Sequence, residues 1–232
     1  MIPLRDNIPS RTVPFVNYVL IGANILAWFL EIGLGRDLPA FIQVFGMVPE
    51  RVIAIATRAP ELILWAIVPF FTSIFLHGGW LHLIGNMLFL YIFGDNVEGV
   101  MGHFRYLVFY LICGVAASLV HLITAPFSPV PTVGASGAIA GVLGAYFLLF
   151  PRARVVTLVP IFFFIQIVEI PAFIFLGFWF LLQFLSGSAA LFSSPGSGGV
   201  AWWAHIGGFA AGVGYTVLRY RYLKEKRGRK AN

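Results

Sequence analysis

The chain has 232 residues, of which 59% are hydrophobic and only 10% are charged, and its mean hydropathy is +0.91. A soluble domain of this size carries about 25% charged residues, so the composition excludes an ordinary soluble protein and predicts one integral membrane domain. The single cysteine, Cys113, excludes an intrachain disulfide. The start MIPLRDNIPSRTVPF lacks the pattern of a cleaved signal peptide, which is a basic start followed by a short apolar core, so we expect the first apolar helix to be retained.

Six stretches are candidates for spanning helices, each of which needs about 20 mostly apolar residues. Between the first and second candidates, the apolar stretches FIQVFGMV and LILWAIVPFF are expected to lie in the membrane interface. The segment 155–185 is longer than one span and holds two helix breakers, Pro160 and Pro171, so its first part is also predicted to be interfacial. The six candidates are residues 14–34, 80–93, 104–123, 136–150, 170–185 and 201–219.

The predicted fold is therefore an all-α membrane protein, a bundle of six transmembrane helices over residues 14–219, with a segment 1–13 before it and a basic tail 220–232 after it. Six spans place both chain ends on one side. Twelve of the 15 lysines and arginines fall on that side, seven of them in RYRYLKEKRGRK. This excess predicts cytoplasmic termini, as in a prokaryotic plasma membrane. The tail favours a contact with anionic lipid over a nucleic-acid partner.

Four polar residues lie near the starts of the second, fourth and sixth helices, all of which begin at the non-cytoplasmic face in this topology. His82 and Asn86 belong to HGGWLHLIGN, Ser136 is the third residue of GASGAIAG, and His205 belongs to AWWAHIGGFAAG. Polar groups in a membrane are costly and face the bundle interior. Because all four lie at a similar shallow depth, we expect them to share one site.

Glycine spacing predicts that the fourth and sixth helices touch. Gly137 and Gly141 are four residues apart on the fourth helix, as are Gly208 and Gly212 on the sixth. Small residues at this spacing let two backbones approach closely. The close approach would bring Ser136 and His205 within hydrogen-bond reach.

These residues fit acyl transfer. A serine hydroxyl needs a base to become a nucleophile, and His205 can take the proton of Ser136 and return it to the leaving amine. No carboxylate is placed to orient His205, which favours a dyad over a triad. Candidate donors to the oxyanion are the Ser136 backbone N–H, unpaired at a helix start, and the side chains of Asn86 and His82.

Other interpretations are weaker. No H-E-x-x-H occurs and the histidine spacing does not suit zinc, so no metal or cofactor is expected. An aspartyl intramembrane protease is disfavoured because it needs two carboxylates in the membrane. A transporter is disfavoured because it is typically built from internal repeats. A membrane-protein binding or quality-control factor without catalytic activity remains the alternative to an enzyme.

The combined motifs resemble those of the rhomboid family of intramembrane serine proteases. The resemblance covers about residues 72–212 and rests on HGGWLHLIGN with GDNVEG, on GASGAIAGVLGAY with FPRARV, and on AHIGGFAAG. It implies Ser136 as nucleophile, His205 as general base, and His82 and Asn86 as oxyanion-stabilising residues. It also implies that Gly134 gives tight backbone passage before the nucleophile.

The resemblance further implies transmembrane protein substrates, a site buried from lipid but open to water, and a structural role for Glu98. It leaves the oligomeric state unknown. Two positions depart from the common family pattern. Val68 and Pro69 stand where many members carry a Trp-Arg pair, and Ala140 stands where some carry an aromatic against which the histidine stacks. We expect substrate entry to involve the fifth helix and a Gly- and Ser-rich lid at 185–199.

Overall fold

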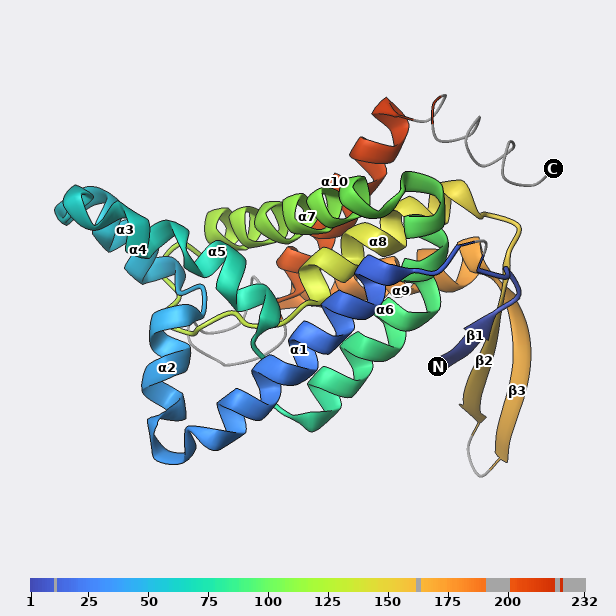
Figure 1. The fold of residues 1–232 in the computed structure, drawn as a ribbon, viewed down its shortest axis with the longest axis horizontal. Helices are drawn as coiled ribbons and strands as arrows, with labels where there is room; N and C mark the ends of the chain where they lie inside the picture. The colour runs from blue at the N-terminus through green and yellow to red at the C-terminus, as the bar shows by residue number, and fades with distance from the viewer. Residues whose placement is uncertain (11, 162–163, 191–200, 220–221, 223–232) are drawn as a thin grey trace.

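The protein is described by a computed structural model that covers residues 1–10, 12–161, 164–190, 201–219 and 222 (Figure 1). The described chain is mostly helical, with three short strands. The strands are β1 (Ile2–Asp6), β2 (Arg154–Ile161) and β3 (Phe164–Pro171). The helices are α1 (Phe15–Gly33), α2 (Leu38–Phe45), α3 (Pro49–Arg58), α4 (Ile63–Ile67), α5 (Pro69–Thr72), α6 (Trp80–Met101), α7 (His103–Thr124), α8 (Ser136–Leu149), α9 (Ala172–Ala190) and α10 (Trp202–Leu218).

Each of the six predicted spans coincides with a helix, but the six crossings stay a prediction. Among the described residues, α1, α7 and α9 are long and apolar enough to cross a membrane. A fourth span results if α6 is counted together with the segment 60–75, from which it is bent by 79°. The sixth helix, α10, has 17 residues, and α8 is a shorter apolar helix of 14.

The second helix, predicted over about residues 80–93 with some extension, continues to Met101. Asp95 and Glu98 lie in this extension, at the end of the helix that the predicted topology places on the cytoplasmic side. Glu98 is fully buried, and its carboxylate accepts hydrogen bonds from the first-turn N–H groups of Val16 (2.9 Å) and Asn17 (2.7 Å). It therefore caps the start of α1, whose own N-cap residue offers no side-chain bond.

The three strands correct the all-α expectation. Most of the segment predicted to be interfacial forms β2 and β3, which pair antiparallel, and β1 pairs antiparallel with β2 to give the strand order β1-β2-β3. The segments RVVTLVPI and FIQIVEIP are rich in the β-branched residues that favour strands. Pro160 is tolerated because β1 pairs only as far as Leu158, which leaves that end of β2 with one neighbour.

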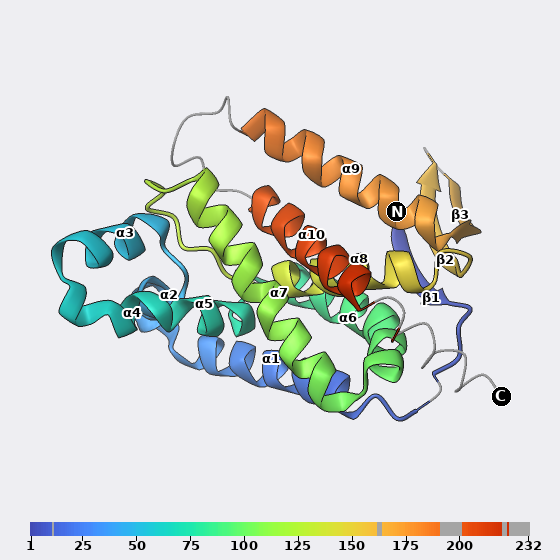
Figure 2. The same ribbon diagram turned by 90° about the horizontal axis from the view of Figure 1, so that it is seen from above.

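Helix α8 lies at the centre of the bundle and packs against α6, α7, α9 and α10. Helices α2–α5 gather at one end of the molecule and the sheet lies at the other, as Figure 1 and Figure 2 both show. Every residue from Gly137 to Tyr146 is buried. Because β2 follows the last residue of α8 in the chain, the first residue of α8, Ser136, lies at the end of the bundle away from the sheet. Residues 191–199, which are nine of the fifteen residues of the expected lid, and all but one residue of the basic tail lie outside the described residues.

Candidate active site

The backbone before Ser136 passes through a space that only glycine fits. Gly134 has φ +125°, and a Cβ on it would lie 2.7 Å from the ring of His82 and 3.6 Å from the amide nitrogen of Asn86. The Gly134 N–H donates to the carbonyl of Ser73 at 2.9 Å, which fixes the chain at this point. The sequence-predicted residues of α6 therefore lie beside the turn that leads into Ser136, where α8 begins.

Ser136 and His205 meet across the contact between α8 and α10. The Oγ of Ser136 and the Nε2 of His205 are 2.7 Å apart. A Cβ on Gly208 would overlap the carbonyl oxygen of Gly137, so the two backbones touch just below this pair. The contact predicted from the glycine spacing is confirmed, and the hydroxyl and imidazole it brings together have the geometry of a nucleophile with its base.

Side chains of helix α9 contact the other side of the His205 ring. The Nδ1 of His205 lies 2.7 Å from the Oε1 of Gln183, and the ring of Trp179 lies 5.9 Å away at an interplanar angle of 35°. Trp202 approaches edge-on from α10 at 6.4 Å. The sequence analysis missed Gln183, although it is the only amide in the apolar stretch from Ala172 to Leu185, which is the signal that could have found it.

Asn86 and His82 flank the approach to Ser136 but are engaged with other groups. Asn86 Nδ2 lies 3.1 Å from His77 Nε2, and the rings of His77 and His82 meet at 5.2 Å. The backbone N–H of His77 donates to both carboxylate oxygens of Glu31, at 3.1 and 3.2 Å. Within the described chain, no hydrogen bond joins Asn86 or His82 directly to Ser136. His77 thus links α1 to α6 behind the turn.

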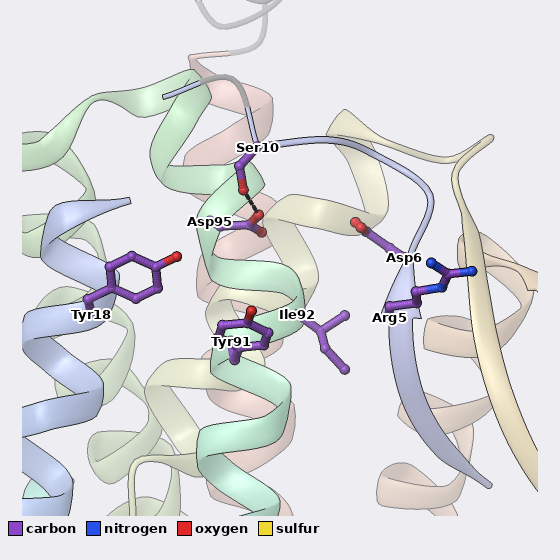
Figure 3. Close-up of a pocket in the computed structure, with 7 residues that line it drawn as sticks. All are labelled: Arg5, Asp6, Ser10, Tyr18, Tyr91, Ile92 and Asp95. Carbon is purple, nitrogen blue, oxygen red and sulfur yellow. Dashed lines mark hydrogen bonds between the residues drawn. The ribbon is translucent and has the colours of Figure 1, made fainter. Parts of the chain in front are cut away.

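A second polar pocket lies at the sheet end (Figure 3). In it the Ser10 hydroxyl donates to the Asp95 carboxylate. Asp6 accepts hydrogen bonds from Tyr146 and, at 3.0 Å, from the side chain of Asn96. Burial raises the pKa of Asp6 to about 6. The pocket is lined by Arg5, Asp6, Ser10, Tyr18, Tyr91, Ile92 and Asp95.

This second pocket is separate from the Ser136–His205 pair. Tyr146, whose hydroxyl reaches Asp6, stands ten residues after Ser136 on α8. At 1.5 Å per residue the two positions are roughly 15 Å apart along the helix axis. Across the described residues, no group of three or more His, Cys, Asp or Glu side chains is arranged to hold a metal ion at either place.

A bundle of apolar helices with a partly buried serine–histidine pair between two of them defines a class of membrane protein, and the comparisons name its family. A model of the Rhomboid domain matches residues 64–222. The match takes in α6 to α10 and both members of the pair. The chain therefore belongs to the rhomboid family and is an integral membrane protein.

Individual relatives cover several compartments. The chain is 37% identical to "Rhomboid protease GluP" of Bacillus subtilis (strain 168) over 133 residues. These residues make up 57% of this chain and 24% of that protein. It is 39% identical over 120 residues to "Rhomboid-like protein 11, chloroplastic" of Arabidopsis thaliana, covering 51% and 40%. It is 30% identical over 164 residues to "Rhomboid protein 1, mitochondrial" of Saccharomyces cerevisiae, covering 68% and 43%. The matched region thus spans less than half of each relative.

Proposed function

We propose that the chain is an intramembrane serine endopeptidase that cleaves transmembrane segments of other membrane proteins with a Ser136–His205 dyad. The observation that supports this most directly is the 2.7 Å separation of Ser136 Oγ and His205 Nε2. In the proposed reaction His205 takes the hydroxyl proton as Ser136 attacks a peptide carbonyl. The imidazolium then gives that proton to the leaving amine, and water hydrolyses the acyl-enzyme.

The oxyanion would be held at the turn before α8. The Ser136 backbone N–H lies at the start of α8, where N–H groups lack helical partners and the helix dipole is positive. Asn86 and His82 lie against Gly134, two residues earlier. For Asn86 to donate to an oxyanion, its amide would exchange the His77 contact for the substrate oxygen. Such preorganised donors typically contribute about 3–4 kcal/mol each to the transition state.

The topology that goes with this function has six spans within residues 14–219 and both termini in the cytoplasm of a prokaryotic cell. Helices α6, α8 and α10 then begin at the non-cytoplasmic face, so water would reach Ser136 from outside. The end that carries α2–α5 would face outward, and the sheet would face the cytoplasm (Figure 1). The partners implied are transmembrane protein substrates and the lipid bilayer.

The test is cleavage of a model transmembrane substrate by the purified chain in liposomes. Wild type is compared with Ser136→Ala and His205→Ala, and Ser136 is probed in parallel with a fluorophosphonate. Ser118→Ala, which removes a buried hydroxyl on α7, is the matched control. We expect cleavage to vanish in both dyad variants, labelling to vanish in Ser136→Ala, and the control to behave as wild type.

A folded wild-type protein that neither cleaves nor labels would overturn this function. In that case the alternative, a rhomboid-like membrane-protein binding or quality-control factor without catalytic activity, would account for the chain. Binding of the same model substrate to wild type and to Ser136→Ala with equal affinity would then be the supporting result.

A further inference from the structure

Both ring nitrogens of His205 have a partner, and each partner comes from a different helix. Nε2 faces Ser136 of α8 at 2.7 Å, and Nδ1 faces the side-chain oxygen of Gln183 of α9 at 2.7 Å. An amide oxygen can only accept a hydrogen bond, so Nδ1 must carry the proton. The neutral imidazole then has its lone pair on Nε2, which is the atom that must accept the serine proton.

Gln183 is held rigidly enough to impose this arrangement. Its side chain is 7% exposed and His205 is 9% exposed. Trp179 lies one helical turn before Gln183 on the same face of α9, and its ring lies against the imidazole. Two side chains of one helix therefore fix the ring: Trp179 limits its tilt, and Gln183 sets which nitrogen is protonated.

We propose that Gln183 is the positioning residue of the dyad, so that α9 completes the active site. The proposal rests on the proposed protease function. Gln183 takes the place that a carboxylate holds in a triad, but as a neutral acceptor it orients the imidazole without adding a charge. Because Ser136 and His205 both lie outside α9, a displacement of α9 breaks the Nδ1 contact and leaves the dyad unoriented. Seating of α9 is thus coupled to catalytic competence.

The proposal is tested by replacing the acceptor while keeping the side-chain length. Gln183→Met removes the oxygen, Gln183→Glu restores an acceptor, and Gln166→Met, at an exposed glutamine of β3, is the matched control. General-base catalysis as a whole contributes about 10²–10⁴-fold. Loss of orientation alone should therefore reduce kcat about 10- to 100-fold in Gln183→Met, with KM within about twofold and the control unchanged.

The charge introduced by Gln183→Glu gives a second readout that a merely structural role would not move. An ionised carboxylate beside Nδ1 stabilises the imidazolium, so the acid limb of the kcat–pH profile should move to higher pH. The kcat at the new optimum should recover at least tenfold over Gln183→Met. Among the described residues, the titratable groups that act electrostatically on His205 are His82 and His121, which all three variants share.

The tautomer of the His205 imidazole can be measured without any cleavage of substrate. In ¹⁵N-histidine-labelled protein, the His205 signal, identified by its loss in His205→Ala, should show a proton on Nδ1 in wild type and a mixed state in Gln183→Met. A wild-type proton on Nε2, or a Gln183→Met variant with wild-type kcat and pH profile, would overturn the proposal. If wild type fails to cleave but shows the Nδ1 proton, the protease function fails and the positioning role stands.

Discussion

The contact between α8 and α10 can be tested by adding a single methyl group. In Gly208→Ala the new Cβ would overlap the carbonyl oxygen of Gly137, which is backbone and cannot rotate away. In Gly214→Ala, on the same helix, nothing lies within 4 Å of the new Cβ. The two variants make the same chemical change in one helix, and they differ only in whether α8 stands in the way.

The magnitude follows from the geometry. Overpacking of a close contact costs typically about 1–3 kcal/mol, and relief requires α8 and α10 to separate by a distance on the order of 1 Å. Ser136 directly precedes Gly137, and His205 lies one turn before Gly208, so the separation lengthens their 2.7 Å contact. A misplacement of this size can reduce catalysis about 100-fold. Gly214→Ala should lose no activity and gain at most about 1 kcal/mol from helix propensity.

The assay is the rate of fluorophosphonate labelling at Ser136, measured beside thermal unfolding of each variant in the same detergent. We expect Gly208→Ala to label about 100-fold more slowly and to unfold at lower temperature. Wild-type labelling and unfolding in Gly208→Ala would refute the close packing of α8 on α10. A loss of labelling in both variants would show that the helix tolerates no added methyl, and the argument from the contact would fail.

Three further changes have defined outcomes. Gly134→Ala should strain a backbone at φ +125° by about 1–3 kcal/mol and push the His82 ring, so both thermal stability and cleavage should fall. Glu98→Ala should lower the free energy of unfolding by about 3 kcal/mol, because two N–H groups at the start of α1 lose their acceptor. Asp6→Asn should make stability less dependent on pH. The pKa of Asp6 is raised to about 6, so the fold favours its protonated form, and that stabilisation, present below pH 4, is lost as the pH rises through 6. After allowance for its partial exposure, Asp6→Asn should gain about 1 kcal/mol over wild type at pH 8, seen as a higher unfolding temperature.

Each of these three has its own control. Gly85→Ala, where nothing lies within 4 Å of the new Cβ, should leave cleavage unchanged beside Gly134→Ala. Glu98→Gln keeps one acceptor oxygen and should lose less stability than Glu98→Ala; equal losses would contradict the capping role. Asp37→Asn makes the same change at an exposed carboxyl and is the matched control, and a wild-type pH profile of unfolding in Asp6→Asn would contradict the effect of burial at Asp6.

The sequence predicted the parts of the site that lie near motifs. Small residues at fixed spacing predict a close contact between two helices, independently of the rest of the fold. The meeting of Ser136 and His205 therefore followed from Gly137 and Gly208, 71 positions apart in the chain. The starts of α8 and α10 agree with prediction to within one residue, since each start is marked by a change from polar or small residues to a long apolar run.

The hairpin and the partner of His205 were not predictable in the same way. Periodicity cannot separate a short apolar strand from a membrane-interface helix, and Pro160 was interpreted as a helix breaker when it lies within β2. Because Ala140 stands where some family members carry the aromatic against which the histidine stacks, another residue has to hold His205. Which residue does so depends on how α9 is rotated about its axis, and no local pattern in its nearly uniform apolar sequence specifies that rotation.

The polar groups around His205 argue for a working site over a packing motif. A buried polar group with no partner costs free energy, and burying one inside a membrane is justified structurally only if it joins elements that would otherwise separate. The α8–α10 contact is already made by glycine backbones at Gly208 and Gly212. The serine hydroxyl adds nothing to that packing. The imidazole between Ser136 and Gln183 has a partner at each ring nitrogen, and these two hydrogen bonds give it one orientation. Under the proposed function these side chains are present for their chemistry, which is the expectation that the labelling of Ser136 tests first.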